Sequence, residues 1–251
     1  MGLGTVKFGR NSGVKYPHRF QIPNDRVLSN LLATARELGI NLLDTAPSYG
    51  SSEERVGRLL GQQRKEWVIT SKVGEQYLDG VSSFDFSADA VRRSVEASLA
   101  RLATDYIDII LVHSDGNDRH IIQELDTLDT LSHLKDRGII RGFGVSTKSV
   151  EGGLLALDHS DLVMVTYNLN YREDEAVLSK ARRVNKGVFI KKALDSGHLS
   201  ATNSATVIAE DALSFVFKHP AVTSVIVGTI DENHLRNNVE IMNRGLDPSD
   251  L

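Results

Sequence analysis

Short runs of apolar, often β-branched residues alternate along the chain with longer segments in which apolar residues recur at helical spacing. The short runs predict strands and the amphipathic segments predict helices. Eight strands are expected, at Leu3–Phe8, Ile40–Asp44, Trp67–Ser71, Ile107–His113, Gly142–Ser146, Leu162–Thr166, Val188–Lys191 and Ser224–Val227. Helices are expected between them, among them Arg26–Leu38, Ala88–Leu102, Ile121–Arg137, Glu173–Arg183, Ala209–Lys218 and Glu232–Asn243.

This alternation indicates one α/β domain over residues 1–251, because no change of composition marks a linker. Eight strand-helix units in roughly 250 residues are typical of a closed (β/α)8 TIM barrel. An open doubly wound sheet is the alternative, but no Gly-x-Gly-x-x-Gly turn follows a strand. The first strand begins close to residue 1, which leaves little chain to close the barrel bottom and is consistent with the loss of a few leading residues.

Composition narrows the function classes. The 251 residues are 41% hydrophobic and 25% charged, which is ordinary globular usage, and a formal charge of -4 argues against nucleic acid as a partner. The absence of cysteine excludes disulfides, thiolate catalysis and Cys-ligated metals. No apolar stretch reaches membrane-spanning length and the N-terminus lacks a signal-peptide pattern, so we expect a cytoplasmic monomer or weak homo-oligomer without membrane partners.

Four polar side chains follow the ends of three predicted strands, where barrel enzymes build their active sites. Alternation along the strands points Asp44, Lys72 and His113 into the barrel mouth, and Tyr49 lies in the turn just after Asp44. We expect Lys72 to lower the pKa of Tyr49 and Asp44 to keep Lys72 charged. A neutral His113 is expected to donate a hydrogen bond to a carbonyl oxygen. This set predicts proton and hydride chemistry on a carbonyl, with hydride from a nicotinamide.

Each of these four residues also has a structural interpretation, as a rim ion pair, a packed aromatic or a hydrogen-bonded strand end. Two other functions are open as well. Lys72 could form a Schiff base in a lyase or aldolase, although pairing with Asp44 makes an ammonium a poor nucleophile. Alternatively, the chain could bind a nicotinamide as a non-catalytic sensor.

The segments that carry these residues resemble the aldo-keto reductases, in their bacterial type. The matching segments are Gly39–Gly50, Thr70–Lys72, Asp105–His113 and Gly138–Ser146, in the family's order and approximate spacing. The resemblance implies an NADP-dependent carbonyl reductase or alcohol dehydrogenase with Tyr49 as proton donor, Lys72 and Asp44 tuning it, and His113 orienting the carbonyl. It implies a small aldehyde or ketone as substrate, or an alcohol or aldose oxidised in reverse.

The resemblance also implies the cofactor contacts. Ser146 matches a nicotinamide-binding residue, whereas Thr147, Met164 and Lys191 stand where the family carries Asn, Gln and an aromatic. The segment Asp195–Leu199 resembles the loop that, in the family, covers the pyrophosphate of the bound dinucleotide. The start of the helix after the eighth strand would bind the adenosine 2′-phosphate. NADP is therefore favoured and NAD is possible. Gly228 and His234 stand where the family often carries basic residues, and Arg236 could supply the missing positive charge. The expected contacts are Gly4, Thr5, Ser146, Thr147, Met164, Lys191, Lys192, Leu194, Ser196, Gly197, Gly228, Thr229, His234 and Asn238.

Other residues of the sequence give weaker indications of function. Tyr167 is as consistent with packing at the end of the sixth strand as with a cofactor contact. The remaining histidines show no metal-ligand spacing, so no metal is predicted; they include His120, His133, His159, His198 and His219. The loop Ser114–Arg119 is short and polar and the chain ends about eight residues after the last predicted helix, which favours an open mouth for small polar aldehydes.

Overall fold

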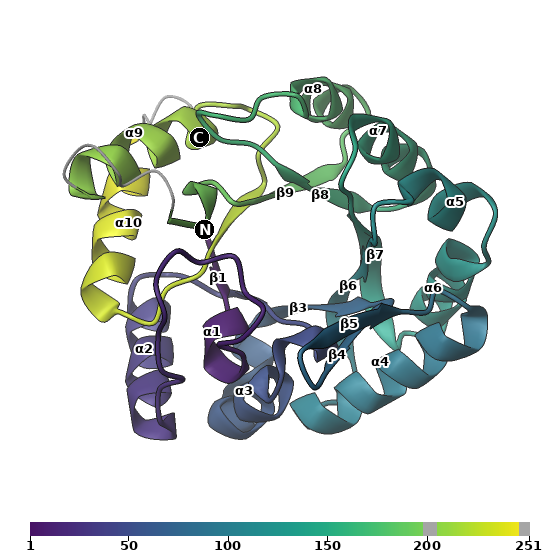
Figure 1. Ribbon diagram of the computed structural model, residues 1–251, viewed down its shortest axis with the longest axis horizontal. Coiled ribbons are helices and arrows are strands. Elements are labelled where there is room, and N and C mark those ends of the chain that lie inside the picture. The colour runs from purple at the N-terminus through teal and green to yellow at the C-terminus, as the bar shows by residue number, and fades with distance from the viewer. Residues whose placement is uncertain (198–204, 246–251) are drawn as a thin grey trace.

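Eight parallel strands close into a barrel in the computed structural model, which describes residues 1–197 and 205–245 (Figure 1). They follow the order β1-β10-β9-β8-β7-β6-β3-β2, and β1 pairs with both β10 and β2. The barrel strands are β1 (Gly2–Gly4), β2 (Leu42–Asp44), β3 (Val68–Val73), β6 (Ile107–His113), β7 (Ile140–Ser146), β8 (Leu162–Thr166), β9 (Gly187–Lys191) and β10 (Ser224–Val227). The predicted (β/α)8 barrel is confirmed.

Helices surround the barrel as an outer ring (Figure 1). Helices α2, α4, α7 and α10 begin at side chains that accept a backbone N–H of the first turn, namely those of Asn24, Ser87, Ser149 and Asp231. The ring consists of α2 (Asp25–Glu37), α3 (Ser52–Leu60), α4 (Ala88–Leu102), α5 (Asp118–Gln123), α6 (Thr127–Asp136), α7 (Val150–His159), α8 (Glu175–Arg183), α9 (Ala205–Phe217) and α10 (Glu232–Gly245).

The apolar residues form two layers. The larger layer lies between strands and helices, and the smaller one fills the barrel with Leu42, Leu111, Leu162, Met164 and Phe189. Leu42 and Leu111 therefore lie on the same inward rows of their strands as Asp44 and His113. The register places Asp44 beside Thr70 and His113 beside Ser146, so the polar residues that continue these rows emerge together at the carboxyl end of the barrel.

Two predicted elements are corrected. The strand predicted at Leu3–Phe8 ends at Gly4, and Val6–Gly9 is the short helix α1, because Thr5 turns the chain by donating its N–H and hydroxyl to the carbonyl of Asp44. The helix predicted at Ile121–Arg137 is two helices, α5 and α6. Its two halves are tied to different neighbours: the Asp118 carboxylate accepts from the start of α7, whereas Thr127 donates to the carbonyl of Phe86.

A two-stranded hairpin that the sequence analysis did not predict lies between β3 and α4. Strands β4 (Glu75–Leu78) and β5 (Val81–Phe84) pair antiparallel around Asp79 and Gly80, whose φ angles are 51° and 88°. Two adjacent positive φ angles are those of the type I′ turn that suits a two-residue hairpin loop. β4 packs against η1, the single turn of 3₁₀ helix at Pro47–Tyr49. The hairpin therefore lies on the rim of the barrel mouth (Figure 1).

Asp108 on β6 is the anion of a largely buried charge network. Its Oδ2 accepts from the Arg64 guanidinium and from the N–H of Ile69, both at 2.9 Å, and its Oδ1 accepts from Arg141 at 3.0 Å. Arg64, on the 3₁₀ helix η2 (Gly61–Glu66), and Asp108 expose only 9% and 7% of their side chains. Removing one partner of such a pair leaves an uncompensated buried charge.

We therefore expect Asp108→Ala to lower the free energy of unfolding by about 3–5 kcal/mol, measured by urea denaturation. Asp89→Ala breaks the exposed pair between Asp89 and Arg92 and is the matched control. It should change stability by about 0.5 kcal/mol or less. Equal small losses in both variants would show that the Asp108 network does not stabilise the barrel.

Candidate active site

A buried ion pair joins the ends of β2 and β3. Lys72 Nζ lies 2.6 Å from Asp44 Oδ1 and donates to the carbonyl oxygen of Thr45 at 2.8 Å. The two side chains are only 2% and 6% exposed. Removing both charges from water is unfavourable, so the pair depends on this close approach and on the additional hydrogen bond. Lys72 is thereby held as an ammonium at the barrel mouth.

Tyr49 lies beside this pair at the end of η1. The Lys72 ammonium sits 4.9 Å from the centroid of the Tyr49 ring. Burial raises the pKa of Tyr49 well above 10, and the negative charges of Asp44 and Glu75 raise it further. The expected lowering of this pKa by Lys72 is thus corrected, because Asp44 neutralises the ammonium. Tyr49 is a protonated hydrogen-bond donor at neutral pH.

His113 faces Tyr49 from the end of β6. The two rings are nearly perpendicular, with centroids 6.4 Å apart. His113 Nδ1 lies 2.6 Å from Glu75 Oε2, an ion-pair distance without full hydrogen-bond alignment. Burial lowers the pKa of His113, and Lys72 lowers it further, against the opposing effect of the Glu75 contact. His113 is therefore neutral at pH 7.

Glu75 was missed in the sequence analysis because the hairpin that carries it was missed. Burial alone would raise its pKa, but the contacts with His113 and the Ser82 hydroxyl outweigh burial and lower the pKa to about 2. The signal that could have found the hairpin is the Asp79-Gly80 pair, a preferred type I′ turn sequence.

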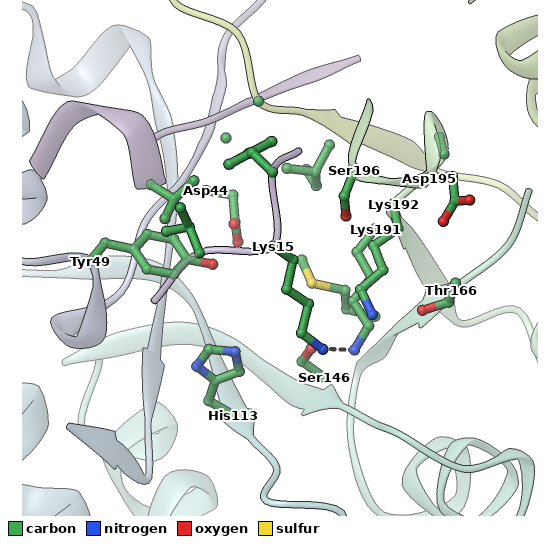
Figure 2. A pocket seen from close by; sticks show the side chains of 18 of the residues that line it. Lys15, Asp44, Tyr49, His113, Ser146, Thr166, Lys191, Lys192, Asp195 and Ser196 are labelled. Atoms are coloured by element: carbon green, nitrogen blue, oxygen red, sulfur yellow. Dashed lines mark hydrogen bonds between the residues drawn. The ribbon is translucent and has the colours of Figure 1, made fainter. Parts of the chain in front are cut away.

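These side chains line a cavity of about 1010 Å³ at the barrel mouth. In Figure 2, Tyr49 and His113 lie toward one side of the cavity and Lys191, Lys192 and Ser196 toward the other. Most of the expected cofactor contacts line this same cavity. They are Gly4, Ser146, Thr147, Met164, Lys191, Lys192, Leu194, Ser196, Gly197 and Gly228.

Lys191 is the last residue of β9, and its side chain lines the cavity beside the end of β7. Its Nζ donates to Ser146 Oγ at 2.8 Å and to the carbonyl oxygen of Thr147 at 2.7 Å. Burial, and next the charge of Lys192, lower the pKa of Lys191 to about 7. Thr147 Oγ1 is buried with no hydrogen-bond partner. The unpaired hydroxyl of Thr147, beside the Lys191 amine, suits a polar ligand group such as a carboxamide.

The other expected cofactor contacts do not line the cavity. The Thr5 hydroxyl holds the backbone of Asp44. Thr229 accepts the N–H of Asp231, and Asn238 is buried on α10. His234 is exposed near the start of α10. Thr5 therefore supports the backbone of Asp44, and the contacts predicted for the adenosine at Thr229, His234 and Asn238 stay predictions.

Two backbone amides at the start of α10 are already bonded to a carboxylate. The Asp231 carboxylate accepts the backbone N–H groups of Asn233 and His234 at 2.8 and 3.0 Å. Arg236, the expected compensating cation, pairs with Glu37 of α2. The part of the pyrophosphate loop that comprises His198 and Leu199 lies outside the described residues.

The structure also places Tyr167, for which the sequence left packing and a cofactor contact open. Tyr167 stacks on Phe215 with ring centroids 5.0 Å apart and does not line the cavity, so it is a packing residue. Within residues 1–197 and 205–245, no group of His, Asp and Glu side chains is arranged to hold a metal ion. In the same part of the chain, no helix is both long enough and apolar enough to cross a membrane.

Comparison with known proteins agrees with this geometry. A family model described as the aldo/keto reductase family matches residues 1–207. The chain belongs to the aldo/keto reductase family. It is thus an oxidoreductase of a family that reduces carbonyl compounds with NAD(P)H. A crystal structure of a putative aldo-keto reductase from Pseudomonas aeruginosa is 50% identical and superimposes with a TM-score of 0.88, covering 98% of this chain and 90% of that chain.

Two curated relatives are more distant. The uncharacterized oxidoreductase YqkF of Bacillus subtilis (strain 168) is 30% identical over 97% of this chain and 87% of its own length. An NADH-specific methylglyoxal reductase of Escherichia coli (strain K12) is 30% identical over 80% of this chain and 65% of its own length. This aldo/keto reductase therefore has relatives along nearly its whole length.

The raised pKa of Tyr49 is directly testable. We expect the ultraviolet-monitored tyrosine titration of Tyr49→Phe, which keeps five of the six tyrosines, to match that of the wild type below pH 10, because the Tyr49 phenol keeps its proton throughout that range. Loss of an ionisation step near pH 8–9 in the variant would show instead that Lys72 stabilises a phenolate. Tyr106→Phe is the control, because it removes a tyrosine that does not line the cavity.

Proposed function

We propose that this aldo/keto reductase transfers hydride between a nicotinamide dinucleotide and a small aldehyde or ketone, or the corresponding alcohol or aldose. Tyr49 is the proton donor to the reacting oxygen, Lys72 and Asp44 tune it, and His113 orients the substrate. The observation that carries the proposal is that the Tyr49 phenol and the His113 imidazole face each other across one end of a large cavity. An oxygen held between them meets pre-oriented polar groups, which favours charge development at that oxygen.

The protein groups at this end have distinct roles. The protonated Tyr49 donates to the reacting oxygen as negative charge grows on it. Lys72, held by Asp44 through the 2.6 Å ion pair, keeps its ammonium against the Tyr49 ring and so helps to position the phenol. Because these groups are already in place, little reorganisation is needed during the reaction.

The dinucleotide, when bound, supplies or accepts the hydride. Lys191, Ser146 and Thr147 would hold its carboxamide end: Lys191 offers a donor where the family's amide is replaced by Thr147. Gly4, Met164 and Gly228 line the cavity between this end and the loop. Lys192, Leu194, Ser196 and Gly197 would cover the phosphates.

Substrate class follows from the walls around Tyr49. We call Asp44, Tyr49, Lys72 and His113 the tetrad. The cavity that contains it is also lined by charged or polar side chains, among them Lys7, Arg10, Glu75, Ser82 and Lys148. Arg10 bonds to the carbonyl oxygen of Ser48 and lies 3.3 Å from the centroid of the Tyr77 ring, so it ties the N-terminal loop to the hairpin. Such walls suit small polar compounds better than an extended apolar ketone.

Two alternatives are weaker on the same geometry. A Schiff-base lyase would need an uncharged Lys72, but its Nζ is held by Asp44 and by the Thr45 carbonyl. A non-catalytic sensor would keep the cavity and lose turnover. Borohydride trapping of a carbonyl compound on cofactor-free protein tests the first, and dinucleotide binding without turnover would indicate the second.

The decisive experiment compares wild type and Tyr49→Phe in dinucleotide oxidation with methylglyoxal and with an activated aromatic aldehyde. Loss of the donor should lower kcat/KM by about 10²–10⁴-fold, whereas dinucleotide affinity, measured by fluorescence quenching, should stay within about twofold because Tyr49 lies at the substrate end. Tyr106→Phe should behave as wild type. Retained turnover in Tyr49→Phe would contradict the assignment of Tyr49.

The start of α10 allows a second test, of the preference between NADH and NADPH. The sequence favours NADP, but the carboxylate of Asp231 already takes the helix amides that a 2′-phosphate would use. We therefore propose that NADH binds at least as well as NADPH. Asp231→Ser removes the negative charge and keeps a capping hydroxyl, so it should improve NADPH affinity several-fold and leave NADH nearly unchanged. Titration of both dinucleotides checks this, and a strong NADPH preference in wild type would contradict it.

A further inference from the structure

In the part of the chain that the structure describes, the Lys191 amine bonds only to neutral oxygen atoms. Its Nζ donates to Ser146 Oγ at 2.8 Å and to the carbonyl oxygen of Thr147 at 2.7 Å, and Figure 2 shows the first of these bonds as a dashed line. Lys72, at the same mouth, is instead paired directly with the carboxylate of Asp44. The amine of Lys191 is therefore held at one place in the cavity without a carboxylate against it.

The reacting end of the dinucleotide has to lie near this amine. Hydride transfer requires the two reacting atoms to approach within about 3–3.5 Å, so the nicotinamide ring must touch a substrate whose oxygen lies between Tyr49 and His113. Ser146, to which Lys191 is bonded, pairs in register with His113 on the neighbouring strand. Burial lowers the pKa of His113 most, and the charge of Lys191 adds to that effect. A ring beside His113 is therefore within reach of the same charge.

The two redox forms of a nicotinamide dinucleotide differ in charge at this ring. The oxidised ring is a cation and the reduced ring is neutral, whereas the phosphates and the adenosine are the same in both. The aromatic side chain that the family carries at the position of Lys191 attracts a cation through its π face. An ammonium repels it, and two unit charges a few ångströms apart in a partly desolvated site interact strongly enough to change affinity about tenfold.

We propose that Lys191 is a specificity-determining residue that makes the cavity bind the reduced dinucleotide more tightly than the oxidised one. The inference rests on the proposed function and adds to it a preference for one redox form of the dinucleotide. It leaves the roles of the tetrad unchanged, and it holds whichever way the hydride is transferred.

The preference should depend on pH, because Lys191 titrates near neutrality. Burial is the largest cause and lowers the pKa of Lys191 to about 7, and nearby lysines lower it while two carboxylates oppose them. The charged groups that act on Lys191 are Lys192 on β9, Asp118 on α5, Asp174 at the start of α8 and Lys72 on β3. Lys15 and Lys148, which line the same cavity, act on Lys192.

The charge of the amine determines the direction of the pH dependence. Below about pH 7 the amine is charged and repels the oxidised ring, and above about pH 7 it is neutral and the repulsion is lost. Because the oxidised ring favours the neutral amine, binding of the oxidised dinucleotide near neutral pH should release part of a proton. The reduced dinucleotide, whose ring is neutral, should release none.

The test measures binding of each redox form rather than turnover. Isothermal titration calorimetry gives the dissociation constants of NADH and NAD⁺ at about pH 6.5 and about pH 8.5; both lack the 2′-phosphate, which itself titrates near pH 6. The ratio of the NAD⁺ constant to the NADH constant should be about threefold larger at the lower pH. Titrations of NAD⁺ near pH 7 in buffers of different ionisation enthalpy should show the proton release.

Two variants of Lys191 should move this ratio in opposite ways. Lys191→Met removes the charge, so the ratio should lose its pH dependence and equal that of the wild type at the higher pH. Lys191→Arg keeps a charge that does not titrate in this range, so its ratio should be about tenfold above that of Lys191→Met at both pH values. Loss of the carboxamide contact in either variant would affect both redox forms alike and would cancel in the ratio.

Lys192→Met is the matched control. Lys192 is the adjacent lysine in the same cavity, and we place it against the phosphates, which both redox forms share. Its loss should weaken NADH and NAD⁺ together and should not lower the ratio. A ratio that is equal in wild type, Lys191→Met and Lys191→Arg would overturn the inference, while the proposed function, tested by Tyr49→Phe, would stand. Failure of wild type to bind either dinucleotide would overturn the proposed function and this inference with it.

Discussion

The buried ion pair between Lys72 and Asp44 is the constraint on which the active site depends. Two opposite charges that are almost removed from water stay favourable only at close range and with their other hydrogen bonds made. Thr45 supplies one of these bonds to Lys72, and Thr5 fixes the backbone of Asp44 through two more. Strands β1, β2 and β3 must therefore end at matching levels, and the register of Asp44 against Thr70 meets that requirement.

The proton distribution at the mouth follows from this pair. Because Asp44 neutralises Lys72, the ammonium does not turn Tyr49 into a phenolate, and burial with two nearby carboxylates keeps the phenol protonated. Lys72 also acts on His113, where it opposes a second proton, while Glu75 acts in the other direction. The site thus combines a donor that keeps its proton with an imidazole poised between two neighbours of opposite charge.

The barrel and the tetrad were predictable because they rest on short-range rules. A period of two along each strand determines which side chains enter the mouth, and it correctly grouped Asp44, Lys72 and His113. What was missed depends on contacts between distant segments: Thr5 turns the first strand into α1 through Asp44, and Asp231 occupies the amides that the sequence offered to a phosphate. The hairpin was missed because its polar, mostly exposed strands lack apolar alternation, although Asp79-Gly80 signals its turn.

The hairpin shows how a loop can alter chemistry that the barrel frame leaves constant. Barrel enzymes place their reacting groups on strand ends and vary the loops around them. Here the strand ends supply the ion pair and the imidazole, whereas η1 supplies Tyr49 and the hairpin supplies Glu75. A single carboxylate against Nδ1 raises the pKa of His113, in opposition to burial and to Lys72. For this reason the tetrad could be predicted from the sequence, whereas Glu75 depends on a hairpin contact that only the structure shows.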